Sequence, residues 1–124
     1  MKPKRPVNLD IGTIHLPLAA LTSITHRISG VVVFAGLSVL LYLFNQSLAS
    51  EADDMHVLVI VGSTPVKLLL WVILSALGYH MVAGCKHLLM DIGIGESREA
   101  GPTGARIVIA LSAILSLIMW VWLW

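Results

Sequence analysis

Polar side chains that could do chemistry recur at helical spacing in one apolar stretch of the sequence. This stretch reads SITHRISG, residues 23–30, and it contains Ser23, His26, Arg27 and Gly30 at steps of three and four residues. Because such steps place side chains on one face of a helix, we expect these four residues to form a single stripe. A hydroxyl, an imidazole and a guanidinium on one stripe suit an anionic or carbonyl-bearing ligand.

Arg27 also has a simpler interpretation. An arginine near a membrane surface can extend its charged end to the interface and bind a lipid phosphate. A helix that begins near Leu18 puts His26 about 12 Å below the helix start, or about two turns into the membrane. Lipid binding accounts for Arg27, but not for His26 and Ser23 on the same face.

A second stretch, GYHMVAGCKHLLMDIG at residues 78–93, carries two more histidines. His80 and His87 share a helix face but lie about 10.5 Å apart along the axis, so they cannot both ligate one iron. Counted from Asp91, His80 lies about 16 Å deep, near the bilayer midplane, whereas His87 is close to the surface.

Three roles for His80 fit this position. The imidazole could hydrogen bond to a neighbouring helix, relay protons, or bind haem iron as a neutral axial ligand. Gly84, one turn away, could let a flat macrocycle approach the backbone, and it could equally mark a site of helix packing.

Composition identifies the surroundings in which these residues act. Of the 124 residues, 57% are hydrophobic and 12% are charged, and the mean hydropathy is +0.90, which is typical of a membrane protein. A net charge of +1 gives no reason to expect nucleic-acid binding. The single cysteine, Cys85, excludes an intrachain disulfide.

Uncharged runs locate the helices that carry the polar residues. A helix that crosses a bilayer needs about 20 apolar residues, and uncharged runs cover 28–50, 68–85 and 107–124. The sequence therefore predicts an all-α membrane protein, a single membrane-anchor domain over 1–124. Its three transmembrane helices are expected at about 19–48, 65–91 and 104–124.

Prolines and glycines mark the expected helix ends. Pro17 makes a longer first helix unfavourable, so we expect this helix to begin between Leu18 and Leu21. Thr64 is the predicted N-cap of the second helix, with Pro65 as its first residue. The run GPTGAR, residues 101–106, is interpreted as a break before the third helix.

Positive charges predict the orientation of the chain. Lysines and arginines precede the first helix and lie between the second and third, while the first connection carries an acidic cluster and no positive charge before Lys67. The N-terminus is therefore expected in the cytoplasm and the C-terminus outside. Six aromatic residues fall at the predicted outer ends of the helices: Tyr42, Phe44, Trp71, Trp120, Trp122 and Trp124.

Three motifs, in this order, resemble a known family. RPVNLDI at 5–11, SITHRIS at 23–29 and HMVAGCKHLLMDIG at 80–93 are similar to the cytochrome b membrane-anchor subunits of succinate dehydrogenase, respiratory complex II. The likeness covers nearly the whole chain. One position departs from the pattern: Lys86 stands where the family usually has arginine, which keeps the charge but loses bidentate geometry.

The resemblance implies a role for four residues. His80 matches the axial ligand of haem b, whose second ligand comes from a histidine of the partner anchor subunit. Ser23 and Arg27 match residues that line a ubiquinone site, and His26 and Arg27 fall where the family contacts the haem propionates. His87 and Asp91 match motif positions to which no role is assigned.

The resemblance also implies the setting of the chain. It would be a multi-pass protein of the bacterial inner membrane, in contact with lipid, that forms part of the quinone site of a succinate:ubiquinone oxidoreductase. Its partners would be a second small anchor subunit, a flavoprotein subunit and an iron–sulfur subunit, the last resting against residues 5–10. Alone it would not oxidise succinate, because one cysteine cannot hold an iron–sulfur cluster.

Two other functions stay open. A haem-free anchor of the fumarate-reductase type would bind quinone without using His80 as a ligand. A channel or transporter component would use the buried histidines to relay protons.

Overall fold

The computed structural model describes residues 13–124, which form four helices and no strand. The helices are α1 Leu18–Ser47, α2 Glu51–Gly62, α3 Thr64–Asp91 and α4 Ala100–Leu123. Three of them, α1, α3 and α4, are long and apolar enough to cross a membrane. The prediction of an all-α protein with three transmembrane helices is confirmed. The RPVNLDI motif lies outside the described residues.

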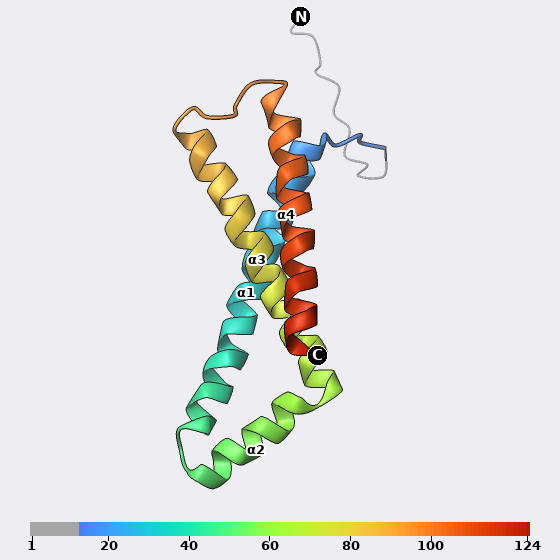
Figure 1. Cartoon of the computed structure of the whole chain (residues 1–124). Helices are drawn as coiled ribbons and strands as arrows, with labels where there is room; N and C mark the ends of the chain where they lie inside the picture. Colours follow the sequence, from blue (N-terminus) through green and yellow to red (C-terminus); the bar gives the residue numbers. More distant parts are fainter. Residues whose placement is uncertain (1–12) are drawn as a thin grey trace, which may run out of the picture.

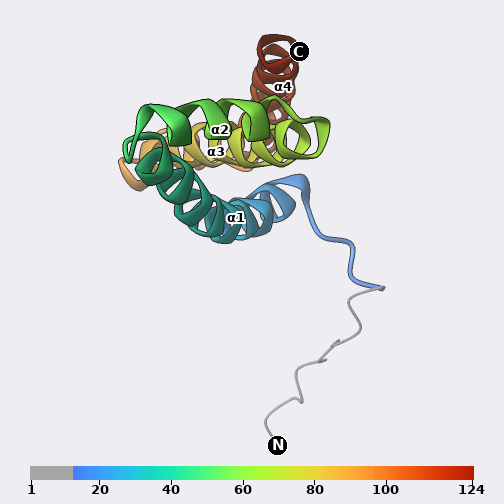
Figure 2. The same ribbon diagram turned by 90° about the horizontal axis from the view of Figure 1, so that it is seen from below.

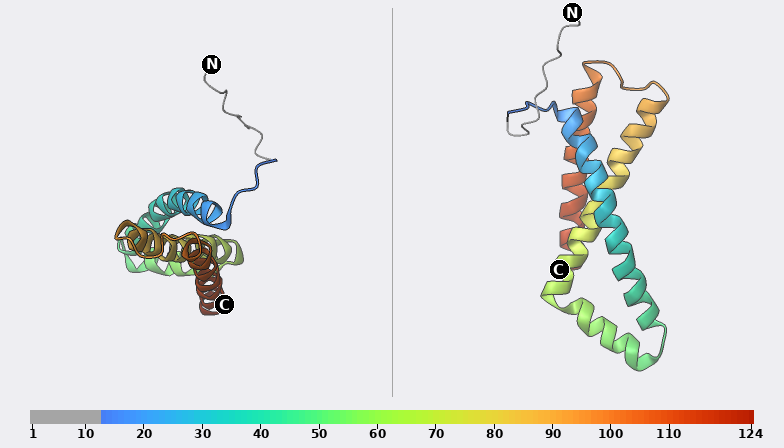
Figure 3. Two further views of the ribbon diagram at one scale, coloured as in Figure 1. Left: turned by 90° about the horizontal axis from the view of Figure 1, so that it is seen from above. Right: turned by 180° about the vertical axis from the view of Figure 1, so that it is seen from behind.

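The three long helices pack side by side with alternating direction. Figure 1 shows α1 and α3 crossing each other, with α4 beside them. The beginning of α1 and the connection between α3 and α4 lie at one end of the molecule, and α2 and the C-terminus lie at the other (Figures 1 and 3). This arrangement agrees with the predicted alternation of the helices. Which end faces the cytoplasm stays a prediction.

The ends of α1 and α3 follow from local capping. Pro17 precedes α1, and its carbonyl accepts hydrogen bonds from the N–H groups of Ala20 and Leu21, at 2.9 and 3.1 Å. The N-cap of α3 is Ser63 rather than Thr64, so Pro65 is the second helical residue. A proline is accommodated there because the first backbone N–H groups of a helix have no intrahelical acceptor.

A break does precede the third transmembrane helix, but its predicted place at GPTGAR is wrong. Helix α4 begins at Ala100, so the run 101–106 forms its first turns. Pro102 is only the third helical residue, where the missing N–H costs no intrahelical hydrogen bond. The N–H of Ala100 donates instead to Ser97 Oγ at 3.0 Å, which satisfies this end of the helix.

Helix α2 was not predicted from the sequence. Ser50 caps it by accepting a hydrogen bond from the N–H of Asp53 at 3.1 Å, and the Ser50 hydroxyl donates to Asp53 Oδ2 at 2.6 Å. Acidic residues in the first turn also interact favourably with the helix dipole. Seen from below, α2 lies across the end of the molecule, between the end of α1 and the start of α3 (Figure 2).

Small and hydroxyl-bearing residues make up much of the buried interior. Ala83 and Ala105 are almost fully buried between the helices, and Thr22, Ser29 and Ser112 are buried as well. Small residues let transmembrane helices approach closely, and hydroxyls can hydrogen bond across them. The side chains of Trp71 and Ser75 both reach Ser116, and so hold α3 against α4.

Candidate functional site

Three imidazole rings meet where α1 crosses α3. The rings of His26 and His80 are stacked, with centroids 4.2 Å apart and planes 14° apart. The ring of His87 is tilted by 46° against His26 at a centroid distance of 5.1 Å. The structure thus brings together His26 and His80, which were predicted at similar depths on two separate helices, and adds His87, which was predicted close to the membrane surface.

Two glycines lie at this crossing, each against the histidine of the other helix. A Cβ at Gly30 on α1 would lie 3.1 Å from His80 Cε1, and a Cβ at Gly84 on α3 would lie 3.4 Å from His26 Nε2. Each helix therefore carries a histidine followed, four residues later, by the glycine that receives the histidine of the other helix. Of the two roles left open for Gly84, this contact favours helix packing.

Nδ1 of His80 is surrounded by oxygen atoms of α1. Ser29 Oγ lies 3.1 Å from it and the carbonyl oxygen of His26 lies 3.2 Å from it. The Ser29 hydroxyl itself donates to the His26 carbonyl at 2.7 Å. No role for Ser29 was predicted from the sequence, although its place three residues after His26, on the same helix face, is the signal that could have identified it.

Nε2 of His80 is free by comparison. Within residues 13–124 it takes part in no hydrogen bond. The side-chain atoms buried without a partner in this range are His26 Nε2 and Ser112 Oγ, so His80 Nε2 remains accessible. An accessible Nε2 with the other ring nitrogen hydrogen bonded is the arrangement of metal-ligating histidines.

A tyrosine hydroxyl fixes α3 against α1 one residue before His80. Tyr79 donates a hydrogen bond to the Thr22 carbonyl at 3.0 Å and also hydrogen bonds with Thr25 Oγ1. Its phenol group is therefore satisfied within the helix pair, although it stands apart from the other aromatic residues in the sequence. The bond helps to hold the position of His80 relative to α1.

Arg27 and Ser23 do not join the three imidazoles. Arg27 is exposed and Ser23 is half-buried, and neither side chain forms a hydrogen bond or ion pair with any residue in 13–124. The predicted single stripe is therefore divided. His26 and Gly30 contact α3, while the hydroxyl and the guanidinium remain open to a ligand or to lipid.

The His80 environment fits one axial ligand of a haem. An axial imidazole needs an available nitrogen, and its other N–H commonly donates to a carbonyl or hydroxyl oxygen, as His80 Nδ1 is placed to do. His26 does not fit as the second ligand to the same iron. The rings of His26 and His80 are stacked with centroids 4.2 Å apart, so a macrocycle could not be held between them.

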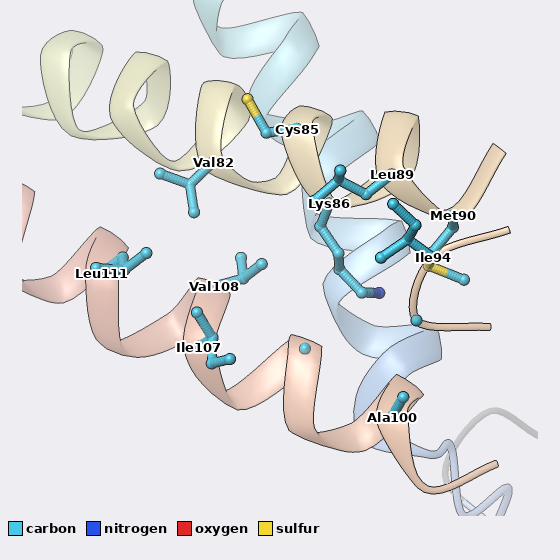
Figure 4. Close-up of a pocket in the computed structure, with 12 residues that line it drawn as sticks. Val82, Cys85, Lys86, Leu89, Met90, Ile94, Ala100, Ile107, Val108 and Leu111 are labelled. Atoms are coloured by element: carbon cyan, nitrogen blue, oxygen red, sulfur yellow. The ribbon is translucent and has the colours of Figure 1, made fainter. Parts of the chain in front are cut away.

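A separate apolar cavity of about 440 Å³ lies between α3 and α4. Among the residues that the structure describes, Lys86 is the only charged one that lines it, and its side chain points toward α4 (Figure 4). Its aliphatic stem lies near Gly104 of α4. None of the predicted quinone or haem residues contributes to this cavity. Lys86 is therefore directed toward α4, although it directly precedes His87 in the sequence.

Residues 1–119 of the chain match the succinate dehydrogenase/fumarate reductase transmembrane subunit family. The chain is 39% identical over 125 residues to the succinate dehydrogenase cytochrome b556 subunit of Coxiella burnetii, and the match covers 100% of both chains. It is 30% identical over 118 residues to the protein of the same name from Rickettsia felis, covering 95% of this chain and 92% of that one. It is 31% identical over 114 residues to that from Paracoccus denitrificans, covering 92% and 88%.

Proposed function

Because this chain belongs to the succinate dehydrogenase/fumarate reductase transmembrane subunit family, we propose that it is the haem b-binding anchor of a succinate:ubiquinone oxidoreductase. The family membership confirms the resemblance predicted from the sequence motifs. It also makes the chain a multi-pass membrane protein and a subunit of an oxidoreductase complex. The observation that carries the haem proposal is the environment of His80, with Nδ1 among oxygen acceptors and Nε2 free.

His80 is the proposed axial ligand to the haem iron. The name cytochrome b556, carried by the relatives, supports a b-type haem as the group bound. When bound, haem b supplies a one-electron redox centre. As the family resemblance implies, the second ligand is proposed to come from a histidine of the partner anchor subunit. The stacking of His26 on His80 agrees with this, because it makes His26 unsuitable for that role.

Ser23 and Arg27 are the proposed ubiquinone-binding residues of this chain. They lie one helical turn apart on α1, and neither has a polar partner among residues 13–124. A quinone carbonyl that accepts electrons gains negative charge on its oxygen. A hydroxyl and a guanidinium can donate hydrogen bonds to that oxygen and stabilise the charge as it develops.

Arg27 and His26 are also the proposed partners of the haem propionates. A guanidinium and a carboxylate form strong charge-assisted hydrogen bonds, most favourably where water is scarce. His26 lies against His80, so a group bound at His80 comes close to it. Arg27 is the adjacent residue, and its side chain is free to bind either a propionate or the quinone.

The proposed partners are a second small anchor subunit, an iron–sulfur subunit and a flavoprotein subunit. They supply what this chain lacks: its one cysteine cannot hold an iron–sulfur cluster, so the succinate-oxidising chemistry is assigned to the soluble subunits. Residues 5–10 are proposed to contact the iron–sulfur subunit. The bacterial sources of the relatives support the inner membrane as the location.

A histidine substitution in the assembled complex tests this function. We expect His80→Ala to remove the reduced-haem absorbance band, because no other imidazole of the described chain offers a free nitrogen with a hydrogen-bonded counterpart. His56→Ala, an exposed histidine in α2, is the matched control and should keep the full band. The measurement is the dithionite-reduced visible spectrum per mole of tagged chain, purified with its partners in mild detergent.

Each other result has a definite meaning. An unchanged spectrum in His80→Ala would refute the ligand assignment. Purified wild-type complex without a haem band would instead identify a haem-free anchor of the fumarate-reductase type. Purification with neither haem nor a flavoprotein would point to the proton-relay function.

A further inference from the structure

We propose that Ser29 is a positioning residue for His80. Together with the backbone carbonyl of His26, it holds the ring proton of His80 on Nδ1 and so presents Nε2 as the ligand atom. The inference rests on the proposed function of His80 and extends it to a residue to which neither the motif resemblance nor the comparisons assign a role.

The direction of the hydrogen bonds follows from the groups that meet at Nδ1. The His26 carbonyl can only accept. The Ser29 hydroxyl has one proton, and it donates this proton to the same carbonyl at 2.7 Å. Ser29 Oγ therefore turns a lone pair toward His80 Nδ1 at 3.1 Å, and the carbonyl turns one toward it at 3.2 Å. With acceptors on both sides, Nδ1 must carry the proton.

Packing keeps the ring in this orientation. Ser29 is only 7% exposed, so water does not compete effectively for its hydroxyl. The backbone of Gly30 lies under one edge of the His80 ring, and the ring of His26 covers its face. Turning the ring over would exchange Nδ1 for a carbon atom and break both hydrogen bonds.

The protonated Nδ1 has a consequence for the bound group. An imidazole whose N–H donates to an oxygen is a more basic ligand at its other nitrogen. A more basic axial ligand favours the oxidised iron and lowers its midpoint potential. Without the Ser29 oxygen, Nδ1 keeps only the carbonyl at 3.2 Å as acceptor, and the midpoint potential should become more positive.

The test uses the complete complex carrying Ser29→Ala, purified in mild detergent. We expect it to bind haem and to show a more positive haem midpoint potential in a spectroscopically monitored redox titration. Ser112→Ala is the matched control, because Ser112 is also a buried helical serine, 8% exposed, but its hydroxyl has no hydrogen-bond partner among the described residues. Its midpoint potential should equal that of the wild type.

A second pair of variants separates the hydroxyl from the shape of the side chain. Ser29→Thr keeps the hydroxyl. Ser29→Val has nearly the same volume as the threonine variant but carries a methyl group in place of the hydroxyl. We expect the threonine variant to stay near the wild-type potential and the valine variant to shift in the same direction as Ser29→Ala. Equal shifts in these two variants, or no shift in Ser29→Ala, would overturn the proposal.

If the proposed haem ligation by His80 is wrong, the variants give a different set of results from those expected if only the Ser29 proposal is wrong. If His80 is not the ligand, His80→Ala keeps the haem spectrum. If His80 is the ligand and Ser29 is not its positioning residue, His80→Ala loses the haem while Ser29→Ala and Ser112→Ala both match the wild type.

Discussion

The backbone carbonyl and the side chain of His26 make separate contacts, although both of them contact His80. Its carbonyl oxygen lies against Nδ1 of His80 and accepts the Ser29 hydroxyl, whereas its ring stacks on His80 and touches His87. A substitution of the His26 side chain therefore leaves the acceptor for His80 in place. The position of the His80 proton is consequently more robust to mutation of His26 than the stacking suggests.

Arg27 carries a charge that has no hydrogen-bond or ion-pair partner among residues 13–124. We expect Arg27→Ala to lower kcat/KM for ubiquinone by roughly 100-fold, because a donor to the developing charge on the quinone oxygen is lost. The kcat/KM of Arg27→Lys should lie between those of the wild type and Arg27→Ala, since lysine keeps the charge but lacks the planar guanidinium. The measurement is succinate–ubiquinone reduction by the complex, with reduction of a soluble dye by succinate as the internal reference.

Arg106→Ala is the control for this prediction. Arg106 is an exposed arginine of α4 and is not assigned to the site, so its loss should leave kcat/KM unchanged. If Arg27→Ala lowered dye reduction as much as ubiquinone reduction, the defect would lie in assembly with the soluble subunits. Unchanged ubiquinone kinetics in Arg27→Ala would contradict a role in quinone binding, and the haem content of the same samples reports on the propionates.

At the scale of elements, the crossing of α1 and α3 depends on Gly36 as well as on the two glycines near the histidines. A Cβ at Gly36 would lie 2.6 Å from Cγ2 of Ile73 and 3.3 Å from its Cβ. Ile73 is 4% exposed and its branched side chain has one strongly preferred rotamer in a helix, so it cannot move aside cheaply. The two helices must separate locally if Gly36 acquires a side chain.

We therefore expect Gly36→Ala to destabilise the complex by about 1–3 kcal/mol, as overpacking of a buried contact does. Thermal unfolding in detergent measures it. Gly62→Ala is the control, because a Cβ there meets nothing within 4 Å. In the double variant Gly36→Ala, Ile73→Ala, the loss should be smaller than the sum of the two single losses. Strict additivity would mean that the clash is absent.

The sequence predicted the elements better than their contacts. Uncharged runs and Pro17 located the transmembrane helices, because the bilayer requires long apolar segments and a proline limits where a helix begins. Helix α2 was missed because the cap formed by Ser50 and Asp53 is a short local signal in a segment read as a connection. GPTGAR was misread because a proline in the first turn does not interrupt a helix.

The site was predictable only in part, for a related reason. Periodicity gives the face of its own helix on which a residue lies, so it identified His26 and His80 as candidates. It does not tell which residue of another helix that face meets. That His26 lies over Gly84, and that Ser29 contacts His80, follows from the crossing of α1 and α3, which is set by Gly36, Gly30 and the residues packed against them.

For the whole molecule, the alternation of helices gives the predicted orientation a direct test. In a background with Cys85→Ser, which removes the only native thiol, a cysteine is placed at Ser50 or at Ser97. We expect Ser50→Cys to react with a membrane-impermeant thiol reagent in intact spheroplasts, because it lies at the end of the molecule predicted to face outward. Ser97→Cys should stay unlabelled until the membrane is opened. Labelling of Ser50→Cys only after lysis would reverse the assigned orientation.

The reciprocal contacts of His26 with Gly84 and of His80 with Gly30 tie four positions together in evolution. A lineage that dispensed with its haem and lost the His80 imidazole would leave a gap over Gly30, which a larger residue at position 30 could fill. The opposite order is unfavourable, since a Cβ at Gly30 would lie 3.1 Å from Cε1 of an imidazole that is still present and would force it to shift. In family members that have lost haem, we therefore expect substitutions at both positions, with His80 replaced first and Gly30 afterwards.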